Sequence, residues 1–303
     1  MMKFQENYNI ELQTFEDFFL VFFVLIDDLY KKVAPNEVKF RPNVDKAFLS
    51  DSEIITIAVC GEFFGIDSEK AWFSLVKKNF RHLFPKMCDR SQFNRTRRNL
   101  MQVTELIFKE LTQNFIDDVF LVDSFPLKVC EFGRAHFCKA FRLEKATYGY
   151  CATKKAKFFG YKVHVLTTSQ GAIISFSITP ANVDDRVGLE DLNCSIPYGS
   201  KIIGDKGYQS ESLRINLAEQ GISLFALRRK NSKENYPQKF YQMIFKMRRR
   251  IETVFSQLTE QMKIERVLAK KFWGLSTRLL NKMLAFNLGL FISQSSHIKS
   301  LVF

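Results

Sequence analysis

Three acidic residues stand in sequence surroundings that suit catalytic carboxylates. Asp123 follows an apolar run, Asp205 follows a second one, and Glu252 lies in a basic stretch with helical periodicity. Carboxylates that meet without a cation repel one another and favour protonation of at least one, whereas Mg²⁺ prefers hard oxygen ligands of this kind. We therefore expect the three residues to form an Asp-Asp-Glu metal site, which implies a phosphate-containing substrate.

Each acid taken alone also suits a structural role, as a turn acceptor, a helix cap or a surface charge. The residues around the acids favour the catalytic role, because five segments resemble the catalytic motifs of bacterial insertion-sequence transposases of the DDE class. These segments are 122–127, 160–165, 179–185, 204–208 and 249–258. The resemblance follows the family's order over about residues 118–290.

The resemblance implies a ribonuclease H-like α/β fold, a mixed sheet flanked by helices. In that fold the first Asp lies on the first strand, the second just after the fourth strand, and the Glu on a later helix. It also implies cleavage at the ends of an insertion sequence, followed by joining of the 3′-hydroxyl to target DNA. The implied cofactors are two Mg²⁺ or Mn²⁺ ions per active site, with Asp123 bridging both, Asp205 holding one and Glu252 the other.

The implied partners are double-stranded DNA, namely terminal inverted repeats and target DNA, and a second copy of the chain in a homodimer on DNA. Relatives often carry a Tyr-x2-Arg-x3-Glu-x6-Lys signature, whose positions here are Phe245, Arg248, Glu252 and Thr259. The Tyr and Lys are missing, and Lys263, one turn further along the expected helix, is the candidate to replace the Lys. These departures keep two alternatives open, a catalytically impaired DNA-binding derivative and a structure-specific nuclease on the same fold.

The charge balance favours a polyanionic partner. The 303 residues include 45 Lys and Arg against 32 Asp and Glu, a net charge of +13,. In residues 154–159 three lysines stand directly before Phe158 and Phe159, a combination of charge and rings that is typical of grooves that track nucleic acid,. Solvated surface charge is the alternative for any one cluster. The candidate DNA contacts are Lys154, Lys155, Lys157, Arg228, Arg229, Arg248, Arg249 and Lys263.

The periodicity of apolar residues divides the chain into two expected domains. Residues 1–115 read as a helical domain, either a helix-turn-helix reader of DNA or a helical support, and residues 116–303 as the catalytic domain with C-terminal helices. A Ser50–Glu53 capping box and Asp89 mark expected helix starts. Strands are expected at 119–125, 161–168, 172–178, up to 204, and 222–226, and helices at 185–193, 210–220, 240–262 and 275–294.

Three further groups of residues carry alternatives. Asp184 and Asp185 compete for a place in the site, but helix capping is favoured for an Asp pair at this position. His164 is expected to be packed or hydrogen-bonded, with catalysis as the alternative. A zinc site is disfavoured against ordinary thiols because the spacing departs from a zinc knuckle in Cys130, His136, Cys138 and Cys151,.

The chain is expected to work in a reducing bacterial cytoplasm, associated with the nucleoid and without a membrane. The apolar run 18–26 is too short to span a bilayer, and the acidic residues before it do not resemble the start of a signal peptide,. The six cysteines form no C-x-x-C pair in a chain large enough to fold without disulfides,.

Overall fold

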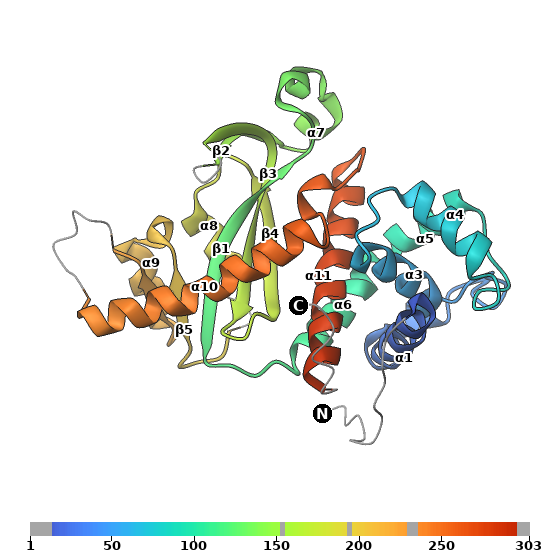
Figure 1. The fold of residues 1–303 in the computed structure, drawn as a ribbon, viewed down its shortest axis with the longest axis horizontal. Helices are drawn as coiled ribbons and strands as arrows, with labels where there is room; N and C mark the ends of the chain where they lie inside the picture. The colour runs from blue at the N-terminus through green and yellow to red at the C-terminus, as the bar shows by residue number, and fades with distance from the viewer. Residues whose placement is uncertain (1–13, 152–154, 193–195, 229–235, 296–303) are drawn as a thin grey trace. The chain divides into compact units, whose positions relative to one another are not determined.

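The computed structural model describes residues 14–151, 155–192, 196–228 and 236–295 (Figure 1). The chain forms two compact units, the first from Met1–Asn114 with Glu260–Phe303 and the second from Phe115–Thr259. By packing, the residues from Glu260 onward therefore group with the N-terminal helices. The functional division at residue 115 stays a prediction. No helix in the described part of the chain combines the length and apolar character that a membrane crossing needs.

The regular secondary structure in the described residues of the first unit is helical, as the apolar periodicity predicted. Its elements are α1 (Phe15–Val33), α2 (Asn36–Lys39), α3 (Asp51–Phe63), α4 (Glu69–Asn79), α5 (Arg90–Asn99), α6 (Met101–Thr112), the 3₁₀ turn η4 (Ile264–Arg266) and α11 (Phe272–Ser295).

Side-chain caps set the starts of two of these helices. Ser50 accepts a hydrogen bond from the amide of Glu53, and the Glu53 carboxylate accepts one from the amide of Ser50, which completes the expected capping box of α3,. Asp89 accepts from the amide of Gln92 at the start of α5. Both predicted helix starts are confirmed, because the caps satisfy amides that have no partner within the helix.

A buried ion cluster ties α3 to α11 inside the first unit. Arg278 binds both oxygens of Glu62, through Nε at 2.6 Å and Nη2 at 3.0 Å, and Lys282 Nζ lies 2.6 Å from Glu62 Oε2. All three side chains are at most 4% exposed. Burial acts to raise the pKa of Glu62, but the charges of Lys282 and Arg278 outweigh it and the pKa is lowered,.

The second unit is built on a six-stranded mixed sheet. Its strands are β1 (Val119–Lys128), β2 (Thr147–Cys151), β3 (Ala156–Thr168), β4 (Ile173–Pro180), β5 (Lys201–Gly204) and β6 (Ser223–Ala226). The main path runs β2-β3-β1-β5-β6, with β4 paired to β3. The pairs β1–β3, β2–β3 and β3–β4 are antiparallel, whereas β1–β5 and β5–β6 are parallel. This is the ribonuclease H-like sheet that was expected.

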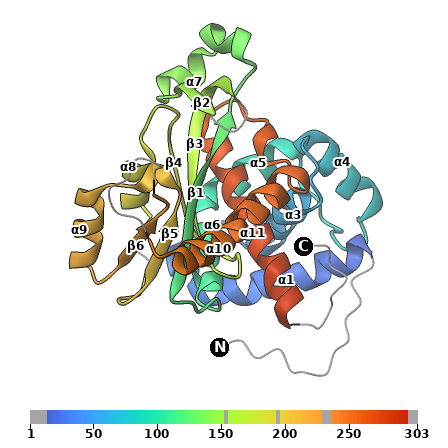
Figure 2. The same cartoon turned by 60° about the vertical axis from the view of Figure 1, so that its left-hand side comes forward.

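Helices cover both faces of this sheet. The long helix α10 (Gln238–Glu260) covers one face, while α8 (Asp185–Glu190) and α9 (Glu211–Glu219) lie on the other (Figure 2). Side chains of β1 alternate between the two layers: Leu121 packs with Ile244 and Ile251 of α10, whereas Phe120 and Val122 pack in the cluster of α8 and α9,.

The segment between β1 and β2 was not predicted from the sequence. After β1 the chain forms the 3₁₀ helix η1 (Phe132–Phe137) and the short helix α7 (Lys139–Leu143), and then enters β2. Figure 1 shows α7 beyond the end of the sheet strands. We refer to residues 129–151 as the β1–β2 arm. The 3₁₀ turn η3 (Lys206–Tyr208) follows β5.

Replacing Gly188 with Ala is expected to destabilise the second unit by about 1–3 kcal/mol. A Cβ built on Gly188 would lie 2.3 Å from His164 Nδ1, and that ring is fully buried with its Nε2 2.8 Å from Thr179 Oγ1. The ring cannot move aside without losing this bond. Denaturant unfolding followed by circular dichroism measures the loss. Gly133→Ala is the matched control, since its Cβ would meet nothing within 4 Å, and an equal loss in both variants would contradict the explanation.

Candidate active site

Asp123 lies in the middle of β1, on the face of the sheet that α10 covers. Its partner across the antiparallel pair is Val165 of β3. The side chain is mostly buried, and Oδ1 accepts a hydrogen bond of 2.8 Å from the amide of Ser124. The pairing of β1 with β3 thus fixes the position of the Asp123 carboxylate along the strand.

Asp205 follows β5, the strand that pairs in parallel with β1. The register places Gly204 beside Val122, so Asp205 and Asp123 each come directly after a paired position and lie at the same level of the sheet. Its Oδ1 accepts a hydrogen bond of 2.6 Å from the amide of Lys206, at the start of η3. If the short strand β2 is not counted, β5 is the fourth strand of the sheet in chain order. Asp123 on the first strand and Asp205 after the fourth therefore match the expected positions of the two Asp residues.

Glu252 is held by the apolar stripe of α10. Ile251, Val254 and Leu258 of this helix are buried, and the neighbouring Glu252 lies at the edge of the seam with its side chain 56% exposed,. The same helix carries Arg248 one turn earlier, so the two side chains lie on one side of it.

A single guanidinium nitrogen joins the three acids. Nη2 of Arg248 lies 3.5 Å from Asp123 Oδ2, 3.7 Å from Asp205 Oδ2 and 3.5 Å from Glu252 Oε1. The Arg248 side chain is only 15% exposed. Side chains from β1, from the end of β5 and from α10 therefore converge on one positive charge.

The environment of Asp123 disfavours its charged form. Burial raises the pKa of Asp123 to about 6; the Ser124 amide and Arg248 act to lower it, and the carboxylates of Asp205 and Asp185 raise it further,. A cation bound beside Asp123 would stabilise its charged form and lower this pKa. Such a perturbed pKa is typical of functional sites.

The donor set fits a divalent metal ion in chemistry and in charge. Three carboxylates supply hard oxygen donors, and the point between them already attracts the positive charge of Arg248,. In the described part of the chain, no three His, Cys, Asp or Glu side chains are gathered closely enough to hold one ion. Closer approach of the acids to a metal therefore requires the Arg248 side chain to move.

The pair Asp184 and Asp185 divides into a cap and a site neighbour. Asp184 caps α8 by accepting from the amide of Arg186, as predicted. For Asp185 the prediction of capping is wrong, because its Oδ1 accepts from Ser124 Oγ at 2.8 Å and lies 3.1 Å from Lys162 Nζ. This role was not predicted, because it depends on how α8 packs against β1 and β3.

His164 is a packed residue, as expected. It is fully buried, hydrogen-bonds to Thr179, and has its Nδ1 3.8 Å from Asp185 Oδ1. Burial lowers its pKa to about 4, although the charge of Asp185 acts in the opposite direction. The ring is therefore neutral at physiological pH.

The residues proposed to contact DNA lie in different surroundings. Lys155 and Lys157 are exposed, but Phe158 and Phe159 are buried, so the rings of that segment belong to the core and not to a surface groove. Arg249 is exposed, with its guanidinium 5.4 Å from the Phe245 ring centroid.

Three further candidates need separate mention. Arg228 lies over the ring of Tyr236. Lys263 is not on α10, because that helix ends at Glu260 and Lys263 takes a left-handed conformation before η4. The expectation that it continues the helix is therefore wrong. The remaining two candidates, Lys154 and Arg229, lie outside the described residues.

The cysteines near the arm do not gather with His136 into a metal cluster within the described residues. Cys130 and Cys138 interact with each other, and burial together with Cys138 raises the pKa of the Cys130 thiol to about 11. Both thiols are free.

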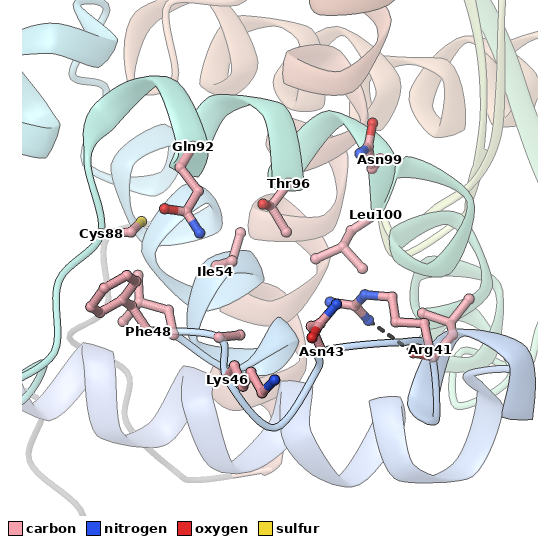
Figure 3. A pocket seen from close by; sticks show the side chains of 13 residues that line it. Arg41, Asn43, Lys46, Phe48, Ile54, Cys88, Gln92, Thr96, Asn99 and Leu100 are labelled. Carbon is pink, nitrogen blue, oxygen red and sulfur yellow. Dashed lines mark hydrogen bonds between the residues drawn. The ribbon is translucent and has the colours of Figure 1, made fainter.

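A pocket of about 440 Å³ opens in the first unit between α5 and the segment before α3 (Figure 3). Gln92, Thr96 and Asn99 line it from α5, and Arg41 from the opposite side is bound to Asp51. None of the predicted site residues lines this pocket. The basic residues of α5 are partly structural, because Arg97 is buried against Glu69.

Comparisons with known proteins place the chain in a family. A family model described as a transposase DDE domain matches residues 113–270, slightly more than half of the chain. Among solved structures, the fold is similar to that of piggyBac transposase in a synaptic complex with hairpin DNA, determined by cryo-EM. The TM-score is 0.50, with 14% identity, over 96% of this chain and 77% of that chain. At this identity the similarity concerns the fold alone.

A comparison with curated proteins gives no match to this chain. The family match covers the whole sheet of the second unit and the helix α10, which together carry the three converging acids. The chain therefore belongs to the DDE transposase family.

Proposed function

We propose that this protein is an active DNA transposase that cleaves phosphodiester bonds at the ends of its insertion sequence and joins the freed 3′-hydroxyl to target DNA. Membership of the DDE transposase family supports the general activity. The observation that carries the specific assignment is the convergence of Asp123, Asp205 and Glu252 on one guanidinium nitrogen.

In this proposal the three carboxylates hold two Mg²⁺ ions, with Mn²⁺ as a substitute. Bound metal activates the attacking water or 3′-hydroxyl and stabilises the leaving oxygen. Asp123, on the central strand β1, would be shared by the two ions. Asp205 and Glu252 each hold one ion, and the exposed position of Glu252 leaves room for the DNA backbone beside it.

Arg248 has a double role in this proposal. Without metal its guanidinium neutralises the acids, and once metal binds it is free to contact a DNA phosphate, which Arg binds well through its planar donors. The exposed Lys155, Lys157 and Arg249 contribute further phosphate contacts, and Lys154, Arg228, Arg229 and Lys263 remain candidates for the same task. Two copies of the chain hold the two DNA ends, since joining both ends requires two sites at once.

A cleavage assay on the flanking inverted repeats of the element tests this function. An active transposase nicks the repeat ends in Mg²⁺ and transfers the 3′ end to a second DNA. Binding without nicking would favour the impaired derivative, for which the absence of the signature Tyr and Lys at Phe245 and Thr259 is the specific observation. Cleavage of branched DNA without strand transfer would favour the structure-specific nuclease.

Replacing Arg248 with Gln is expected to destabilise the metal-free protein by about 1–2 kcal/mol. This is less than the ~3–5 kcal/mol for breaking a fully buried pair, because Asp205 and Glu252 are 42% and 56% exposed,. Without the guanidinium the three carboxylates repel one another, so added Mg²⁺ should stabilise the variant more than the unmodified protein. Thermal unfolding with and without Mg²⁺ measures both effects.

Arg249→Gln is the matched control. Arg249 is on the same helix, and its guanidinium lies over the Phe245 ring, whereas that of Arg248 lies among the three acids. If Mg²⁺ stabilised Arg248→Gln no more than the control, the idea that Arg248 occupies the cation position would be wrong.

A further inference from the structure

The exposed aromatic rings of the second unit are concentrated around the β1–β2 arm. Phe132, Tyr148 and Tyr150 are 47%, 49% and 60% exposed. Rings of this size are normally covered in a folded protein, and their grouping on a surface is typical of a binding site. These three rings are therefore candidates for a binding site.

These rings belong to one continuous face. In the antiparallel pair of β2 and β3, Tyr148 lies opposite Phe159 and Tyr150 opposite Lys157, so all four side chains project from the same side of the ribbon,. The Phe132 ring packs edge-on against Tyr148 at 5.7 Å, and Arg142 lies 5.9 Å from the Phe159 ring centroid. We refer to Phe132, Arg142, Tyr148, Tyr150 and Lys157 as the ribbon face.

The opposite side of the ribbon holds this face in place. A Cβ on Gly149 would lie 2.8 Å from Ala181 Cβ and 2.8 Å from the Phe158 ring, so only glycine permits this approach. The close packing fixes β2 while leaving Tyr148 and Tyr150 pointing outward. A rigid platform of rings loses little conformational freedom on binding, which favours affinity.

The ribbon face lies on the same side of the sheet as Asp123. Asp123 is opposite Val165 on β3, and Lys157 is eight residues before Val165 on the same strand, so the two side chains share a face,. At ~3.3 Å per residue the separation along the strand is about 26 Å. That length corresponds to about eight base steps of DNA at ~3.4 Å per step.

The charge around the face suits a nucleic acid. The arm carries four Lys or Arg residues against two Glu, and Lys155 and Lys157 add exposed positive charge beside Tyr150. Positive charge attracts any phosphate backbone, but exposed rings select for bases whose faces are free. In a duplex those faces are already stacked, whereas in an unpaired segment they are available.

We propose that the ribbon face binds unpaired bases of the DNA substrate, stacking them on Tyr148 and Tyr150 while Arg142 and Lys157 contact the phosphates. This inference rests on the proposed function, since it takes the substrate to be DNA. It adds a second contact, about 26 Å along β3 from the catalytic acids, that recognises strand separation and not sequence.

Fluorescence anisotropy of the full chain in EDTA tests the proposal. The probes are a fluorescein-labelled single strand of mixed sequence and the blunt duplex formed with its complement. Tyr150→Ala should weaken binding to the single strand by about tenfold and leave duplex binding unchanged, because one stacking platform is lost. Tyr150→Phe, which keeps the ring, should bind the single strand like the unmodified protein.

Tyr198→Ala is the matched control. Tyr198 is 89% exposed and precedes Lys201, which pairs with Val119 at the start of β1, whereas the ribbon face lies beyond the end of β1. Its loss should not change binding to either probe. Lys157→Gln should weaken binding to both probes and reduce the salt dependence by about one phosphate contact. Circular dichroism confirms that each variant is folded.

Five results would overturn the proposal. Single-strand affinity of Tyr150→Ala equal to that of the unmodified protein would do so, as would equal losses in Tyr150→Ala and Tyr198→Ala. Binding of the unmodified protein to duplex but not to single strand would reject the ribbon face while leaving the transposase function standing, whereas binding to neither probe would reject both. A change of sedimentation in Tyr150→Ala without DNA, with its DNA affinity intact, would identify the face as a contact between copies of the chain.

Discussion

Asp123→Asn is expected to reduce DNA strand cleavage in Mg²⁺ by at least about a thousandfold while leaving DNA binding within about twofold of normal. The substitution preserves the shape of the side chain and the hydrogen bond from the Ser124 amide, but it removes the charge of the acid on the central strand. Metal ions contribute several kcal/mol to transition-state stabilisation, and every ~1.4 kcal/mol is a tenfold change in rate. A nicking assay on labelled repeat ends measures the rate.

Asp118→Asn supplies the control for this experiment. Asp118 precedes β1, has a side chain 74% exposed, and pairs only loosely with Lys201 at 3.5 Å. The Asp118→Asn variant therefore loses the same charge just before the start of β1, and its cleavage rate should be unchanged. Normal cleavage by Asp123→Asn in Mg²⁺ would remove this residue from the catalytic site, and equal loss in both variants would indicate a general effect of charge.

Glu62→Gln is expected to destabilise the first unit by about 3–5 kcal/mol. The amide keeps the size of the carboxylate but removes the charge that the buried Arg278 and Lys282 share, and Arg278 keeps a longer contact, 3.9 Å, to Glu69. The penalty for an uncompensated buried charge is larger than the value of the pair itself. Urea unfolding followed by tryptophan fluorescence measures the effect selectively, because both tryptophans, Trp72 and Trp273, belong to this unit.

The control for Glu62 is an exposed ion pair in the same unit. Glu105 pairs with Lys109 one turn later on α6, with side chains 48% and 62% exposed. Glu105→Gln should cost less than ~0.5 kcal/mol because water screens such pairs. An equal loss of unfolding free energy in Glu62→Gln and Glu105→Gln would show that burial does not decide how much the ion cluster stabilises the unit.

The elements that hold the acids could be predicted because each has a strong local signal. The apolar run before Asp123 and the one before Asp205 became β1 and β5, and the stripe beside Glu252 became α10. Helix starts at Ser50 and Asp89 followed from their caps. Such signals act within a few residues, so they are readable without knowledge of tertiary contacts.

The features that the sequence did not predict depend on contacts between distant segments. Asp185 has the sequence context of a cap, and only the packing of α8 against β1 and β3 brings its carboxylate to Ser124 and Lys162. Phe158 and Phe159 follow a run of lysines, a context that favours surface rings, yet packing with the arm and with Gly149 buries them. The strand β2 was missed because it has only five residues and the glycine at its centre interrupts the pattern of Thr147, Tyr148 and Tyr150,.

The convergence of the acids on Arg248 could not be predicted from the sequence either. A helical Arg one turn before Glu252 was expected to face DNA, and its distances to Asp123 and Asp205 depend on how α10 crosses the sheet. The three-residue site itself remains a prediction that rests on the resemblance and on this geometry.

The most direct test of the central claim is an anomalous-difference map from crystals of the protein bound to DNA and Mn²⁺. The account predicts manganese density bonded to carboxylate oxygens of Asp123, Asp205 and Glu252, with the Arg248 side chain moved away from the acids. Manganese bound elsewhere in the protein, with Arg248 still between the three carboxylates, would contradict it.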